Sequence, residues 1–181
     1  MLYMFFADGF EEVEAIATLD VIRRAGISIK SVGVGNKTVT GSHNIPVVCD
    51  ITTVELSYNS DEVDGIILPG GMPGTTNLMN NVFVDSFIDS CHSDNKLICA
   101  ICAAPMILGR KGLLEGKEAV CFPGFEDELK GADFSAKYVC NSDGIITAKG
   151  MGSAIDFGLE IVSELIDKET AAKLKATLQC S

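Results

Sequence analysis

The sequence predicts an α/β fold in which helices cover both faces of a mainly parallel central sheet. Uninterrupted apolar runs, such as Leu2–Phe6, Gly65–Leu68 and Leu97–Ile101, are typical of strands that are buried on both faces. Segments with helical spacing of apolar residues separate these runs along almost the whole chain. This alternation is the order expected of parallel strands joined by crossover helices, and it predicts a flavodoxin-like three-layer sandwich.

The individual elements are predicted from apolar periodicity and from residues that favour helix ends and turns. Asp8, with Glu11 three residues later, has the spacing of a capping box, and Gly26 ends the helix that follows. In order, we expect a strand at 2–6, a helix from Asp8 to about Ala25, a strand at 27–34, a hairpin at 38–49 with its turn at 41–44, a strand at 65–68, a helix at 82–91, a strand at 97–101, a helix at 103–110, strands at 119–122, 136–140 and 145–148, and helices at 153–166 and 168–178.

Length and composition favour one globular domain over residues 1–181, because this length supports a full core. Hydrophobic residues make up 47% of the chain and charged residues 22%, as in ordinary folded proteins. Fourteen Lys and Arg against 25 Asp and Glu give a net charge of −11. That charge disfavours direct binding to nucleic acid or to anionic membranes.

The cysteine pattern and the start of the chain predict a cytoplasmic protein. Seven cysteines are scattered without the spacing of a disulfide scaffold, which favours a reducing compartment. The first strand begins at Leu2, so we expect no signal peptide before it. The apolar runs are shorter than the roughly 18 residues of a membrane helix.

Glu14 is the first candidate for chemistry, because it follows the first strand and shares a helix face with Ala17, Val21 and Ala25. A carboxyl group on an apolar face requires a proton or hydrogen bonds, and burial raises its pKa. The alternative is that Glu14 lies at the margin of this face and extends its carboxylate into water. Glu11 and Glu12 are expected to point elsewhere.

Gly70 and Gly71 follow the strand that ends at Leu68. Consecutive glycines at such a point can turn their backbone N–H groups toward one anion. Their spacing is not that of a dinucleotide-binding or nucleotide triphosphate-binding loop. The alternative is a tight turn without a ligand.

Cys102 follows the strand that ends at Ile101, and Pro105 suits the first turn of a helix just after it. The cysteine therefore falls at a strand-to-helix junction, where hydrolases place their nucleophile. The small residues Ala100, Ala103 and Ala104 leave room for a sharp turn. A helix N-terminus favours a thiolate, whereas the alternative is a buried cysteine that acts as a small apolar residue.

Other uses of the cysteines and histidines are less favoured. Cys99 and Cys102 form a C-x-x-C pair, but Cys99 lies inside a strand, where residues three apart face opposite sides. A zinc site lacks a second pair, with only His43 and His92 available, so we expect neither metal nor cofactor. His92 is expected to interact with a helix C-terminus. The remaining cysteines are expected to be structural, except for a frayed Cys180 (the others are Cys49, Cys91, Cys121 and Cys140).

Five segments together resemble the ThiJ/PfpI superfamily, and within it the parkinsonism-associated deglycase group with its bacterial YajL-like members. They are Gly9–Glu14, Arg23–Ile27, Leu68–Gly71, Ala100–Pro105 and Gly150–Leu159. The resemblance implies a flavodoxin-like fold, a homodimer and a reactive thiolate at Cys102 that is hydrogen-bonded by Glu14. It further implies an oxyanion site at the backbone N–H groups of Gly71 and Ala103, next to Gly70.

Three positions depart from this pattern. Protease-like members carry a histidine where this chain has Ala103, so a Cys-His dyad at this position is absent. Some deglycase members have a histidine where Phe122 stands, although YajL-like members lack it. His43 occupies a position where an arginine is common, and both His43 and Phe122 are candidate substrate-pocket residues.

The expected function is that of a cofactor-independent cysteine enzyme, of glyoxalase III or deglycase type, with a role in oxidative stress. Its substrates would be small α-oxoaldehydes such as methylglyoxal, or their adducts on glycated protein side chains, processed by Cys102 and Glu14. The alternative is a redox sensor or redox-gated chaperone without turnover, which would use the same two residues. A cysteine peptidase or a thiazole-biosynthesis protein fits the residues less well.

Overall fold

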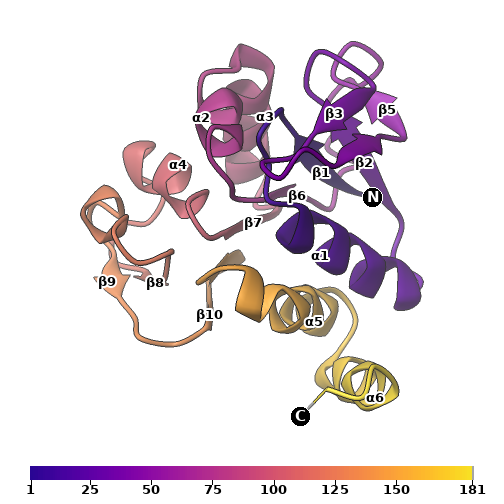
Figure 1. Cartoon of the computed structure of the whole chain (residues 1–181). Helices are drawn as coiled ribbons and strands as arrows, with labels where there is room; N and C mark the ends of the chain where they lie inside the picture. Colours follow the sequence, from indigo (N-terminus) through magenta and orange to yellow (C-terminus); the bar gives the residue numbers. More distant parts are fainter. Residues whose placement is uncertain (181) are drawn as a thin grey trace.

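The computed structural model describes residues 1–180 and contains a seven-stranded central sheet (Figure 1). Its strands, in the order β10-β11-β7-β6-β1-β2-β5, are Val139–Ser142, Ile145–Ala148, Leu97–Ile101, Gly65–Leu68, Leu2–Phe6, Ile29–Gly33 and Ile51–Thr52. All neighbouring strands are parallel except β10 and β11. The predicted mainly parallel sheet is confirmed.

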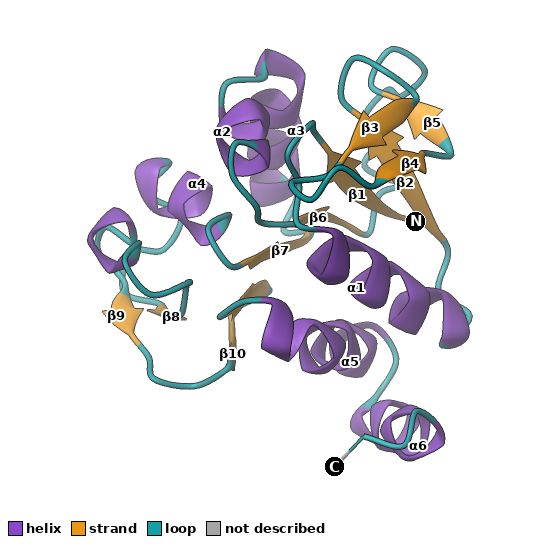
Figure 2. Ribbon diagram, viewed as in Figure 1, coloured by secondary structure: helices purple, strands orange, loops and turns teal. Residues whose placement is uncertain are grey.

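Helices cover both faces of this sheet (Figure 2), because successive side chains of each strand point to opposite sides. Tyr3 and Phe5 of β1 pack into a core with the helices α2, α3 and α4 (Gly74–Met79, Val82–Ser93 and Pro105–Arg110). Met4 and Phe6 pack into the opposite core with α1 and α5 (Glu12–Arg24 and Ala154–Leu165). The last helix, α6 (Lys168–Thr177), packs against α5.

Two smaller sheets lie outside the central one. The predicted hairpin is present as β3 (Thr38–Thr40) and β4 (Pro46–Val48), which pair antiparallel. The strand predicted at 119–122 is wrong beyond its first residue: β8 is Glu118–Ala119, and it pairs with β9 (Asp133–Phe134). The chain leaves the strand because the N–H group of Phe122 donates to the carbonyl oxygen of Cys102.

Local competition for hydrogen bonds shifts several predicted boundaries. Asp8 does not cap α1, because its carboxylate accepts the N–H group of Thr40 at 2.9 Å, and the helix begins at Glu12. Helix α2 was not expected, since its Gly-Thr-Thr-Asn start has low helix propensity. The strand predicted at 136–140 begins only at Val139, and α4 begins at Pro105.

The sheet order brings the three candidate segments together. Strands β7, β6 and β1 are consecutive neighbours and run parallel, so their carboxyl ends share one edge. Cys102, Gly70 and the loop that leads to Glu14 follow these three ends. Within residues 1–180, none of the helices combines the length and apolar character needed to span a membrane.

Candidate functional site

Cys102 occupies the predicted sharp turn between β7 and α4. Its φ angle is +65°, a left-handed conformation that is uncommon for residues other than glycine. Two backbone hydrogen bonds of 2.8 Å hold it: its N–H group donates to Ala148, and its carbonyl oxygen accepts from Phe122. The side chain is half-buried, so the thiol has limited access to solvent. A strained backbone held in this way is a common feature of functional sites.

Glu14 is buried, with 1% of its surface exposed, and it lies on the face of α1 that packs against the sheet edge. The N–H group of Gly70 donates to Glu14 Oε2 at 2.9 Å. The carboxyl group also hydrogen-bonds the side chain of Cys102. The alternative in which Glu14 extends into water is therefore wrong, because a backbone donor and the thiol hold the group inside.

The glycine pair serves two different purposes. The N–H groups of Gly71 and Ala103 hydrogen-bond the sulfur of Cys102, whereas the N–H group of Gly70 is engaged by Glu14. Gly71 has a φ angle of +89°, and a Cβ atom there would lie 2.4 Å from the backbone nitrogen of Glu11. Two N–H donors thus converge beside the sulfur, which suits a developing oxyanion.

Glu14 and Cys102 compete for a single negative charge. Burial raises the pKa of Glu14 to about 7, although hydrogen bonds from Cys102 and Gly70 act in the opposite direction. Burial and the neighbouring Glu14 carboxylate raise the pKa of Cys102 to about 12, against the lowering effect of the Gly71 and Ala103 N–H groups. Because each anion disfavours the other, the pair loses its first proton at about pH 7 and holds a single proton over the pH units above that. A thiolate forms under these conditions when Glu14 retains that proton.

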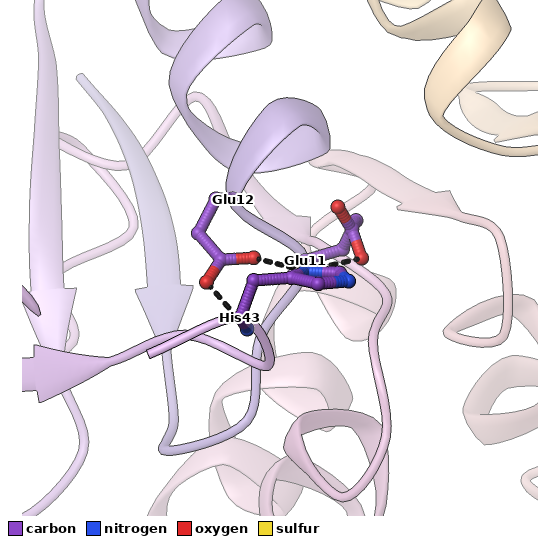
Figure 3. Close-up of side chains that lie close together, drawn as sticks. All are labelled: Glu11, Glu12 and His43. Carbon is purple, nitrogen blue, oxygen red and sulfur yellow. Dashed lines mark hydrogen bonds and ion pairs between the residues drawn. The ribbon is translucent and has the colours of Figure 1, made fainter. Parts of the chain in front are cut away.

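His43 lies on the β3–β4 turn, as predicted, and its ring contacts Glu12 (Figure 3). His43 Nδ1 is 2.9 Å from Glu12 Oε2 and 3.7 Å from Glu11 Oε2, and the His43 N–H group donates to Glu12 Oε1 at 2.7 Å. The hydrogen bond to Glu12, together with the charge of Glu11, raises the pKa of His43. Glu11 in turn adds to the raised pKa of Glu14. His43 is therefore linked to the pair of Glu14 and Cys102 through the charge of Glu11, and not through a contact with the sulfur.

The cluster of Glu11, Glu12 and His43 brings one potential metal-ligand atom from each residue within 4.8 Å of the others. Burial alone would raise the pKa of Glu12, but hydrogen bonds from the His43 ring and from backbone N–H groups lower it to about 2. These hydrogen bonds account for the arrangement without an ion. The cluster fixes the hairpin against the start of α1.

Phe122 lies where the sequence predicts a pocket residue, and its ring is beside Gly150: a Cβ atom on Gly150 would be 3.1 Å from the ring and 3.9 Å from Glu14 Oε1. Two further residues near this point, Tyr138 and Met151, were missed by the sequence reasoning. Tyr138 is the residue just before β10, and Met151 begins a short 3₁₀ helix (Met151–Ser153). No sequence motif links these two segments. The only signal for Met151 was the Gly150–Leu159 segment of the resemblance, and Tyr138 lies outside the segments of that resemblance.

We expect Cys102 to be the first of the seven cysteines to be oxidised by stoichiometric peroxide. Cys49, Cys91, Cys99, Cys121 and Cys140 are buried, and burial raises the pKa of each thiol. Burial and the Glu14 carboxylate raise the pKa of Cys102 as well, but Cys102 is only half-buried, two N–H donors stabilise its anionic sulfur, and Glu14 no longer opposes the thiolate when it keeps its proton. Peptide mass spectrometry should find the first added oxygens there. Earlier oxidation of Cys49 or Cys140 would show that the assignment of the reactive thiol is wrong.

Comparison with known proteins gives one consistent family. Residues 1–164 match the sequence model of the DJ-1/PfpI family. The Parkinson disease protein 7 homolog of Danio rerio is 33% identical over 175 residues, which are 95% of this chain and 93% of that protein. Two solved structures are similar: oxidized Toxoplasma gondii DJ-1, with a TM-score of 0.93 and 32% identity over 99% of this chain and 98% of that one, and Drosophila melanogaster DJ-1beta, with a TM-score of 0.93 and 31% identity over 99% and 97%.

These matches cover the strand ends that carry Glu14, Gly70, Gly71 and Cys102, and they agree with the flavodoxin-like resemblance seen in the sequence. The chain belongs to the DJ-1/PfpI family.

Proposed function

We propose that this chain is a cofactor-independent enzyme that converts α-oxoaldehydes such as methylglyoxal, free or added to protein side chains, to hydroxy acids. The observation that supports it best is the buried pair of Glu14 and Cys102, which shares one proton beside two convergent N–H groups. A nucleophile, a proton carrier and oxyanion donors are the three groups that such a rearrangement requires.

The reaction begins when the Cys102 thiolate adds to the aldehyde carbon and forms a hemithioacetal. The N–H groups of Gly71 and Ala103 stabilise the oxyanion, and the proton of Glu14 neutralises it. Glu14, now ionised, takes the proton from the same carbon to give an enediol and returns it to the adjacent carbon, which leaves a thioester. Water then hydrolyses the thioester, so that methylglyoxal and one water become lactate. Glu14 is the proton carrier, because Ala103 stands where a histidine would be needed.

Lactate formation from methylglyoxal by the purified protein tests this function. We expect many equivalents of lactate per protein chain, and none from the Cys102→Ser variant. Consumption of a single equivalent of aldehyde, with a stable adduct on Cys102, would refute turnover.

A redox sensor is a second candidate, since one similar structure is that of an oxidized DJ-1 from Toxoplasma gondii. A protonated Glu14 would donate a hydrogen bond to a sulfinate on Cys102 as readily as to a thiolate. The lactate measurement separates the two functions, because a sensor reacts once and does not turn over.

We also propose that the chain forms a homodimer. Val13 and Ile16 on α1 and Val48 on β4 are large apolar side chains with 41% or more of their surface exposed. Ile16 and Val48 line one shared groove, so the outer face of α1 continues onto the hairpin. Burial of such a patch is the usual driving force for a subunit interface. Light scattering at micromolar concentration should give twice the chain mass of 19.2 kDa, and a mass of 19.2 kDa would contradict the dimer.

A further inference from the structure

A groove of about 240 Å³ opens beside the candidate pair and is lined mainly by apolar groups. Phe122, Tyr138 and Met151 contribute its largest side chains, and they are 46%, 66% and 58% exposed. Exposed apolar side chains that gather in one concave place are typical of a ligand-binding surface. None of the three takes part in the proton transfer or oxyanion binding described above.

Two residues that line the groove, Gly150 and Phe122, lie next to the site. A Cβ atom on Gly150 would lie 3.1 Å from the Phe122 ring and 3.9 Å from Glu14 Oε1, so the floor of the groove borders the carboxyl group. The Phe122 N–H group donates to the carbonyl oxygen of Cys102, which anchors one wall of the groove to the reactive residue. One wall of the groove is thus bonded to the backbone of Cys102, and Gly150 places another part of its lining next to Glu14.

We propose, on the basis of the proposed function, that this groove is a subsite for an aromatic substituent of the oxoaldehyde. A methyl group would leave most of the volume to water, whereas a phenyl ring would displace much more of that water and cover apolar surface of Phe122 and Met151. The one cation at the groove, Lys149, lies over the Tyr138 ring at 5.3 Å from its centroid. The Lys149 ammonium group thus makes a cation–π contact with Tyr138. We therefore expect the groove to favour an apolar substituent over an anionic one.

Alkylation of Cys102 by two α-bromoketones tests the subsite without requiring turnover. In each reaction the thiolate forms a bond to the methylene carbon and bromide leaves, so that phenacyl bromide and bromoacetone differ only in a phenyl or a methyl substituent. The ratio of their second-order rate constants at Cys102, divided by the same ratio for glutathione, removes the intrinsic reactivity of the reagents.

We expect this normalised ratio to be about tenfold or more, the discrimination typical of an apolar pocket. Phe122→Ala and Met151→Ala should each bring it toward one. Phe134→Ala is the matched control, because Phe134 is 53% exposed and lies outside the groove. It should keep the ratio of the unmodified protein.

A normalised ratio near one for the unmodified protein, or equal ratios for Phe122→Ala and Phe134→Ala, would overturn the subsite. The latter result is also the one expected if a second copy of the chain covers the groove. Lactate formation from methylglyoxal combined with a normalised ratio near one would support the proposed enzyme function and refute only the aromatic subsite. A high normalised ratio without lactate formation would support the aromatic subsite and refute the proposed turnover.

Discussion

Replacement of Glu14 by glutamine is expected to reduce turnover of methylglyoxal by about 100-fold or more, while Cys102 stays open to alkylation. Glutamine keeps a hydrogen-bond donor near the sulfur, but it cannot release or accept a proton. The enediol step then loses its base. Among the described residues, Glu14 is the carboxyl group that is hydrogen-bonded to Cys102, and Ala103 has no side-chain base that could replace it. Steady-state lactate formation and the iodoacetamide rate at Cys102 measure the two effects separately.

The Glu14→Leu variant serves as the comparison for this prediction. Leucine removes both the proton and the donor, so the thiolate loses a hydrogen bond, and alkylation of Cys102 should slow together with turnover. Normal lactate formation by Glu14→Gln would show that Glu14 is not the proton carrier, and the proposed chemistry would need another base.

Gly70→Ala is expected to abolish turnover almost as completely, although it adds only one methyl group. The added Cβ atom would lie 2.5 Å from the Cβ atom of Cys102, 2.6 Å from Glu14 Oε2 and 3.0 Å from the carbonyl oxygen of Ile101. These neighbouring atoms cannot shift without breaking other contacts, because the backbone of Cys102 is held by two hydrogen bonds and Glu14 accepts a hydrogen bond from the Gly70 N–H group. Both halves of the pair are therefore displaced.

Overpacking of this kind costs about 1–3 kcal/mol of folding free energy, so denaturant unfolding should be measured beside activity. Gly152→Ala is the control for the unfolding measurement, since a Cβ atom at Gly152 meets no other atom within 4 Å. Its free energy of unfolding should change little. Wild-type lactate formation by Gly70→Ala would show that the two side chains do not need their present separation.

The sheet edge that carries the candidate site could be predicted, because the strands that form it are visible in short continuous segments of the sequence. The runs that form β1, β6 and β7 are continuous and apolar, and parallel strands place their carboxyl ends at one edge. Cys102 follows the end of β7 directly and Glu14 lies in the helix after β1, so the spacing placed both residues at one edge. Their direct contact was implied only by the family resemblance. The face shared by Glu14 and Val21 left two alternatives, a buried carboxyl group or one that extends into water, and the structure shows the buried one.

The surroundings of the pair could not be predicted, because they depend on contacts between distant segments. The bond between Glu12 and His43 spans 31 residues and requires the hairpin to fold over the start of α1. Asp8 had suitable cap spacing, but Thr40 of that hairpin supplies its donor instead. The groove of Phe122, Tyr138 and Met151 comes from three separate segments, and no pattern in the sequence indicates that they meet.

The shared proton of Glu14 and Cys102 is the central claim, and the pH dependence of Cys102 alkylation by iodoacetamide tests it most directly. The rate should rise with the loss of the first proton of the pair at about pH 7, where the pKa of Glu14 lies, and then stay flat over the next units of pH. Full ionisation of the thiol belongs to a second step near pH 12, because it requires both groups to be charged. The Glu14→Gln variant should lose the step at about pH 7. A single rise at the ordinary cysteine pKa of about 8.5, identical in both proteins, would contradict the account.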